Sequence, residues 1–192
     1  MTQPSVTEEP TKAHTLKAHR PQIGGLMVVK GNLKGDFFMP KRYYIAYGSN
    51  LNVEQMKYRC PDARIIGTAM LDGWTLLFKG SKTGSYLTIE QKEGESVPVA
   101  VWEVSPQDEA RLDRYEGYPY FYYKKEMNIS IKGIRTGLIR KRRAFVYIMH
   151  EERPLGQPTR GYLNACAQGY YFFGFDTDRL IQAVHDSKEA SL

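Results

Sequence analysis

Two short polar segments hold the residues that could do chemistry. The first is YGSNL at 47–51, which follows an apolar run. It contains a glycine, Gly48, directly followed by the short polar residues Ser49 and Asn50. Gly48 has no side chain, so a ligand can approach the backbone closely there. A turn before a helix N-terminus presents N–H groups that favour an anion such as a carboxylate. The same residue types are also common in an ordinary turn between a strand and a helix.

The second segment, LDRYEGYP at 112–119, contributes one carboxylate, that of Glu116. This residue is expected to end a helix, directly before a glycine that caps it. The negative end of the helix, together with burial by Tyr115, Tyr118 and Tyr120, would raise the pKa of the carboxylate. A carboxylate with a pKa near neutrality is suited to proton transfer. Taken alone, however, a glutamate at a helix end is more often simply solvated.

No other catalytic pattern stands out. The four histidines lack the spacing of metal ligands, and no glycine-rich motif for a phosphate or dinucleotide is present. Cys60 and Cys166 are far apart and are expected to be reduced thiols of a cytoplasmic protein. The sequence has no run of about 20 apolar residues and no apolar signal core at its start. No membrane attachment is therefore expected.

The net charge of +6 could suggest a nucleic-acid partner. Seven basic and three acidic residues lie in 1–42, however, which leaves residues 43–192 with a charge of only +2. Binding of nucleic acid through the basic run KGIRTGLIRKRR at 132–143 is the weakest hypothesis, because such a run is more often a solvated hairpin. No nucleic-acid partner is expected.

The elements that must position the two segments begin near residue 41. Residues 1–40 lack periodicity and contain several prolines and glycines, which predicts a poorly ordered tail before one domain at 41–192. Met39 could be the native start. Apolar runs predict strands at 43–47, 64–71, 74–80, 85–91, 97–104, 122–131 and 143–149. Helices are predicted at about 53–59, 105–116, 160–174 and 176–187. Asn52 with Gln55 resembles a capping box at the start of the first helix, and Ser105 is the expected N-cap of the second.

Strands concentrated in the middle of the chain, with helices between them, predict an α+β fold. So many short strands in one domain favour a small mixed β-barrel, closed or nearly closed, with flanking helices.

The two segments also resemble a known family in their order and spacing. YIAYGSNL, followed about 65 residues later by LDRYEGYP, is similar to the γ-glutamylcyclotransferase family. The stretches QMKYRCPDARIIGTAMLDGW and PTRGYLNACAQGYYFFGFD look like bacterial members of it. The resemblance covers about 44–187, nearly the whole predicted domain.

The resemblance implies a reaction and a site. The α-amino group of a γ-glutamyl substrate attacks its own side-chain carbonyl, which closes 5-oxoproline and releases an amine or amino acid. Glu116 matches the catalytic glutamate, the general acid and base. Backbone amides of the 47–51 loop would hold the α-carboxylate side of the substrate. The residues implied to bind substrate are Tyr47, Gly48, Ser49, Asn50, Leu51, Tyr147 and one of Tyr122 and Tyr123.

The resemblance also implies that neither a metal nor a cofactor is needed. A monomer or weak homodimer is the default expectation. The leaving group is left open between an amino acid, an amine, a peptide and a biosynthetic carrier. The main alternative is a non-catalytic module that uses the same loop to bind a small carboxylate.

Overall fold

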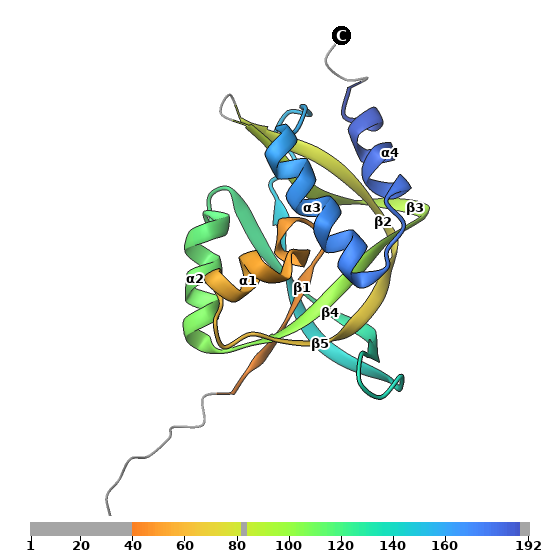
Figure 1. The fold of residues 1–192 in the computed structure, drawn as a ribbon. Coiled ribbons are helices and arrows are strands. Elements are labelled where there is room, and N and C mark those ends of the chain that lie inside the picture. Colours follow the sequence, from red (N-terminus) through yellow and green to blue (C-terminus); the bar gives the residue numbers. More distant parts are fainter. Residues whose placement is uncertain (1–39, 82–83, 189–192) are drawn as a thin grey trace, which may run out of the picture. The chain divides into compact units, whose positions relative to one another are not determined.

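The computed structural model describes residues 40–81 and 84–188, and its ribbon is a β-barrel with helices packed outside it (Figure 1). The strands are β1 Arg42–Ala46, β2 Arg64–Ser81, β3 Gly84–Val104, β4 Tyr122–Gly133 and β5 Ile139–Met149. The helices are the 3₁₀ turn η1 Ser49–Leu51, α1 Val53–Arg59, α2 Pro106–Glu116, α3 Arg160–Phe173 and α4 Asp178–Asp186. The predicted tail at 1–40 falls, except for Pro40, outside the described residues.

The barrel closes in the strand order β1-β3-β2-β4-β5. Its strands are antiparallel except where β1 meets β5, which pair in parallel through Tyr44 with Phe145 and Ile45 with Val146. The predicted α+β class and mixed barrel are thereby confirmed. None of the described helices is both long and apolar enough to cross a membrane.

Four of the predicted strands are in fact two long ones. The segments predicted at 64–71 and 74–80 form β2, and those at 85–91 and 97–104 form β3. A shift of register between Asp72 and Trp74 marks a bulge, and Gly73 there has φ of +79°. A bulge bends and twists a strand without ending it, so glycine and charged residues at a bend look like a turn in the sequence.

The helix caps place both candidate segments as predicted. The Asn52 side chain accepts a hydrogen bond from the Gln55 amide at 3.0 Å and begins α1 directly after the 47–51 loop. Ser105 caps α2 in the same way. The helix ends at Glu116 because Gly117 takes a left-handed conformation, with φ of 64°.

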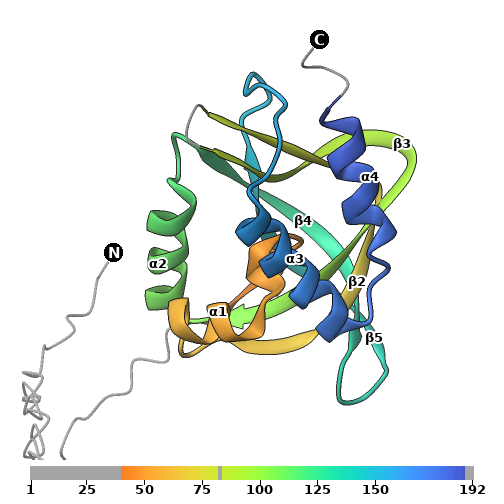
Figure 2. The same cartoon turned by 45° about the horizontal axis from the view of Figure 1, so that its top comes forward.

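Helix α3 packs closely on the 47–51 loop, beside α1 (Figures 1 and 2). Gly169 of α3 allows this contact, since an added Cβ would lie 2.4 Å from the Cβ of Leu51. We expect Gly169→Ala to lower the free energy of unfolding by about 1–3 kcal/mol, measured by urea denaturation. Gly161→Ala is the matched control, because its Cβ would meet nothing within 4 Å. Equal stability of the two variants would contradict this close packing.

Candidate active site

A cavity of about 290 Å³ opens between η1, the end of α2 and the start of β4. Gly48, Ser49 and Asn50 line one side, and Glu116 lines another. The rest of the wall is mostly aromatic: Leu87, Arg114 and Gly117 line it together with Tyr44, Tyr47, Tyr86, Tyr115, Phe121, Tyr122, Tyr147 and Tyr162. Such a space suits a small, partly polar ligand.

Arg59 of α1 determines which way the Asn50 side chain faces. A guanidinium has only donors, and its Nη1 lies 2.7 Å from Asn50 Oδ1, so the amide oxygen must point toward Arg59. Asn50 Nδ2 is therefore directed at the cavity, where it donates to Glu116 Oε1 at 2.8 Å and to Tyr44 Oη at 2.8 Å. Arg59 itself lies over the ring of Tyr115, 3.8 Å from its centroid. This arrangement leaves Glu116 Oε2 without a described partner and available to a ligand.

Burial raises the pKa of Glu116 from its ordinary value of 4.5 to about 7. The positive charge of Arg59 and the hydrogen bond from Asn50 oppose this rise without cancelling it. The raised pKa was expected, and burial is its main cause. Of the three tyrosines expected to bury Glu116, however, only Tyr115 lines the cavity, and Tyr118 and Tyr120 are exposed. A carboxyl group with this pKa is present in both protonation states near neutral pH, so it can accept a proton and return it.

Three cavity tyrosines donate their hydroxyl hydrogens to the protein. Tyr47 donates to the carbonyl oxygen of Tyr147 at 2.7 Å, and Tyr122 donates to that of Leu87 at 2.9 Å. Tyr147 in turn donates to Asp113 Oδ1 at 2.6 Å. Because a hydroxyl has one hydrogen, these three oxygens present only lone pairs to a ligand, which suits an ammonium group.

The hydroxyl of Tyr44, unlike those of the three tyrosines above, can donate a hydrogen bond to a ligand. Its oxygen accepts a hydrogen from Asn50, and within residues 40–81 and 84–188 its own hydroxyl hydrogen has no acceptor. Burial raises the pKa of Tyr44 well above its usual range, so this hydrogen stays in place at neutral pH. Tyr44 can therefore donate to an oxygen that gains negative charge in the cavity.

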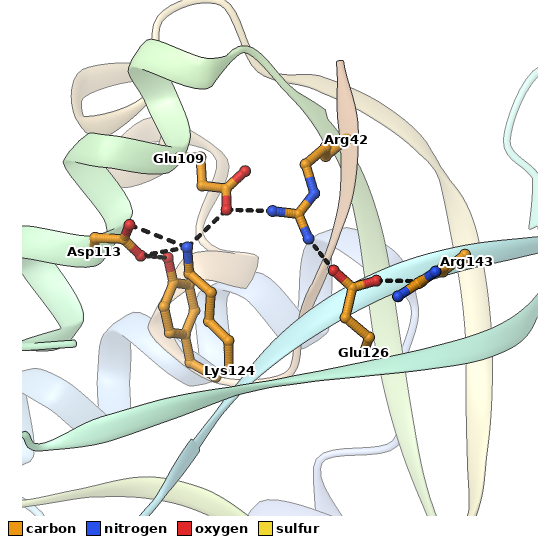
Figure 3. Close-up of polar contacts among 7 residues, drawn as sticks. Arg42, Glu109, Asp113, Lys124, Glu126 and Arg143 are labelled. Carbon is orange, nitrogen blue, oxygen red and sulfur yellow. Dashed lines mark hydrogen bonds and ion pairs between the residues drawn. The ribbon is translucent and has the colours of Figure 1, made fainter. Parts of the chain in front are cut away.

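Asp113, which orients Tyr147, is held by a row of alternating charges (Figure 3). Lys124 Nζ lies 2.7 Å from Asp113 Oδ1 and 2.6 Å from a carboxylate oxygen of Glu109. The row continues through Arg42, Glu126 and Arg143. These contacts keep Asp113 in place as an acceptor, so the Tyr147 hydrogen stays directed away from the cavity.

Seven of the nine residues proposed from the sequence line this cavity: Tyr47, Gly48, Ser49, Asn50, Glu116, Tyr122 and Tyr147. Leu51 is fully buried, and its amide donates to the Gly48 carbonyl at 2.9 Å. Tyr123 donates to Glu151 at 2.7 Å outside the cavity, because neighbouring residues of a strand face opposite sides.

Several polar residues of the site were not found from the sequence. The sequence pattern indicates only that Tyr44 belongs to an apolar strand and Arg59 to a short helix. Asp113 had a detectable signal, because it lies three residues before Glu116 on the same helix and such residues are neighbours on its surface.

The two thiols are not suited to nucleophilic attack. Cys60 and Cys166 are free and buried, and burial raises the pKa of each to about 12. A thiol with that pKa is protonated at neutral pH. In the part of the chain that the structure describes, no three His, Cys, Asp or Glu side chains are grouped to hold a metal ion.

The structure thus combines a closed barrel with a small aromatic cavity that contains one carboxyl group of raised pKa. Comparison with known proteins shows to which family the chain belongs. Residues 44–166 match the family described as "Gamma-glutamyl cyclotransferase, AIG2-like", and the chain belongs to this family.

Individual relatives agree with this assignment. A γ-glutamylcyclotransferase from Bos taurus is 36% identical over 81 residues, which cover 38% of this chain and 43% of the bovine protein. The match thus spans less than half the length of that curated relative. A solved γ-glutamyl cyclotransferase has a TM-score of 0.62 at 25% identity, over 75% of this chain and 86% of its own. An uncharacterized human protein has a TM-score of 0.64 at 25% identity, over 74% and 86%.

Other expectations stay predictions. They are the particular resemblance to bacterial members, the cytoplasmic location and the monomer or weak homodimer.

Proposed function

We propose that this protein cyclises a γ-glutamyl substrate to 5-oxoproline and releases an amine or amino acid, with Glu116 as general acid and base. The observation that carries this proposal is the position of Glu116: its carboxyl group faces the cavity beside the 47–51 loop, and its pKa is raised to about 7. The family to which the chain belongs supports the choice of reaction. The reaction needs no cofactor, because the nucleophile and the electrophile belong to one molecule.

The cavity suggests how the substrate lies. The hydrogen bonds of the 3₁₀ turn begin with the Leu51 amide, so the amides of Ser49 and Asn50 have no described acceptor and can bind the substrate α-carboxylate. The α-ammonium group donates to Glu116 and to the lone pairs of Tyr147 or its neighbours. This placement brings the α-nitrogen close to the γ-carbonyl carbon, and such proximity is the main contribution of the protein to the rate.

The chemical steps then follow in order. The α-ammonium, with a pKa of roughly 7.7–8.0, gives a proton to Glu116. Its nitrogen attacks the γ-carbonyl, a C–N bond forms, and the carbonyl oxygen becomes negative. The hydroxyl of Tyr44 donates to that oxygen. Glu116 returns the proton to the leaving nitrogen as the original C–N bond breaks and the carbonyl re-forms. It then takes the second proton from the ring nitrogen and passes it to the released amine, which leaves as an ammonium.

A mass-spectrometric scan for 5-oxoproline tests this proposal. The purified chain is incubated with γ-glutamyl dipeptides, γ-glutamylamines and glutathione, beside a heat-inactivated sample. Enzyme-dependent oxoproline would support the reaction, and the preferred substrate would identify the leaving group. Binding of oxoproline by a folded protein that turns over none of these substrates would favour the non-catalytic module instead.

Arg59 provides a test of how the pKa of Glu116 is set. Arg59 lowers that pKa, so Arg59→Met is expected to raise it further above 7. The rise of kcat/KM with pH, which follows ionisation of the base, should then move up by about one pH unit or more. Arg64→Met is the control, since Arg64 is an exposed arginine outside the cavity lining. An unchanged pH profile would argue against Glu116 as the titrating base.

A further inference from the structure

The turn between β4 and β5 exposes three large aliphatic side chains together. Ile134, Leu138 and Ile139 are 53%, 55% and 71% exposed. The turn projects at the lower right of the ribbon in both views (Figures 1 and 2). Single exposed aliphatic residues are ordinary, but three at one projecting turn form a local apolar surface.

Hydrogen bonds hold this turn in one shape. The Gly133 amide donates to the Leu138 carbonyl at 2.9 Å, and the Gly137 amide donates to that of Gly133 at 2.8 Å. Gly137 has φ of +66°, which favours glycine. The Ile134 amide donates to the Ile66 carbonyl of β2 at 3.0 Å, which ties the turn to the barrel. The three aliphatic side chains are thus carried by a turn whose backbone conformation is fixed by hydrogen bonds.

Basic residues surround the aliphatic ones. They are Lys132, Arg135, Arg140, Lys141 and Arg142, and all but the partly buried Arg142 are exposed. Residues 127–150 contain no Asp or Glu. Across the described parts of the chain, none of these five cations forms an ion pair with a carboxylate, whereas Arg143, farther from the turn, pairs with Glu126. The positive charge of the turn is therefore uncompensated.

Against the expectation from the sequence of no membrane attachment, we propose that this hairpin tip, residues 132–142, binds the surface of an anionic membrane. The aliphatic side chains enter the boundary between headgroups and acyl chains, and the basic ones contact anionic headgroups. Nucleic acid would also attract the charge, but single strands are bound largely by stacking on aromatic side chains. This tip has none, and its most exposed residues are aliphatic.

Membrane binding at the tip would leave the cavity accessible. Tyr122, which lines the cavity, begins β4, and Gly133 ends it. A strand rises about 3.3 Å per residue, so the two lie roughly 35 Å apart along β4. This inference is therefore independent of the proposed cyclisation and can be tested separately.

Flotation of the full chain with vesicles tests the proposal. We expect binding to phosphatidylcholine vesicles that contain 30% phosphatidylserine but not to pure phosphatidylcholine, and weaker binding at high salt. Replacing Lys132, Arg140 and Lys141 by Gln should weaken partitioning about fivefold for each charge. Replacing Ile134, Leu138 and Ile139 by Ser should weaken it by more than tenfold.

Matched variants change equal numbers of other exposed hydrophobic or basic side chains elsewhere on the surface, and they should bind as the wild type does. The aliphatic set is controlled by Ser at the exposed Tyr58, Tyr171 and Ile181. The basic set is controlled by Gln at the exposed Lys57, Arg160 and Lys188. Thermal melting of every variant establishes that it is folded.

A second measurement does not depend on loss of function. An environment-sensitive dye on Ile139→Cys should shift to the blue with anionic vesicles, and the same dye on Ile181→Cys should not. The native thiols are buried and free. The proposal would be overturned if the protein failed to bind anionic vesicles at low salt, or if both tip variants bound them as well as the wild type does. Binding to RNA is measured with the same variants. Variants that lose RNA binding but keep vesicle binding would also overturn the proposal.

Discussion

Replacing Glu116 by glutamine is expected to lower the rate of cyclisation by about 10²–10⁴-fold, the contribution typical of a positioned proton-transfer group. Glutamine has almost the same shape as glutamate, and its Oε1 can still accept the hydrogen bond that Asn50 donates at 2.8 Å. The variant cannot take the proton of the substrate ammonium. Loss of activity with an intact fold would therefore identify the missing function as proton transfer.

The same variant has a predictable effect on stability. Because burial raises the pKa of Glu116 to about 7 from 4.5, the folded protein retains a proton that the unfolded chain has already released between these values. Stability therefore falls as pH rises through this window. Glutamine is neutral at every pH and lacks this loss. We expect Glu116→Gln to melt at the wild-type temperature near pH 4.5 and above it at pH 8.

Oxoproline release and thermal melts at the two pH values measure both effects. Glu54→Gln is the control, because Glu54 is an exposed glutamate of α1. It should change neither the activity nor the difference in melting temperature between the two pH values. An active, well-folded Glu116→Gln protein would rule out the proposed role of Glu116.

Much of the fold was predictable because its signals are local. The caps at Asn52, Ser105 and Gly117 use side chains and a backbone conformation within a few residues of each helix end, and all three were predicted correctly. The two long strands were divided incorrectly, because a bulge at Gly73 and a turn have the same local composition. Continuity of a strand depends on pairing with its neighbour, which a local pattern does not report.

The site was predictable only where its residues are close in sequence. The loop and Glu116 stand in short motifs, and both line the cavity. Arg59 contacts Asn50 from the far end of α1, and Asp113 of α2 contacts Tyr147 of the distant strand β5. Those contacts depend on how the helices pack against the barrel. The direction in which each hydroxyl points follows from its partner and could not be read from residue type.

Changing Asn50 to aspartate should have the second large effect, because it alters one group next to Glu116. The substitution replaces the amide nitrogen that donates to Glu116 Oε1 at 2.8 Å by an oxygen. Two carboxylates this close cannot both ionise easily. Arg59 Nη1 lies 2.7 Å from Oδ1 of residue 50, so the new carboxylate is the one that the positive charge stabilises. The pKa of Glu116 should therefore rise above 7.

A protonated Glu116 cannot act as a base, so the pH profile should report the change. We expect kcat/KM at pH 7 to fall by about 10- to 100-fold, since each unit of pKa removes about tenfold of the ionised form. The variant should recover part of its activity as pH is raised to 9. Its two carboxyl groups should titrate as a coupled pair. A loss that is the same at every pH would contradict an electrostatic cause.

Asn52→Asp is the control that separates charge from damage to the loop. Asn52 lies two residues further along, outside the cavity lining, and its Oδ1 accepts the capping hydrogen bond from Gln55. Asn52 Nδ2 donates to Gln168 Oε1 at 2.7 Å, and the Gln168 amide can turn to donate to an aspartate instead. Aspartate is an equally good N-cap, so this variant should keep its fold and its pH profile. If both variants lose activity alike, the loop needs its neutral amides for structure. If only Asn50→Asp loses activity, and regains it at high pH, the amide of Asn50 is what keeps Glu116 ionisable near neutral pH.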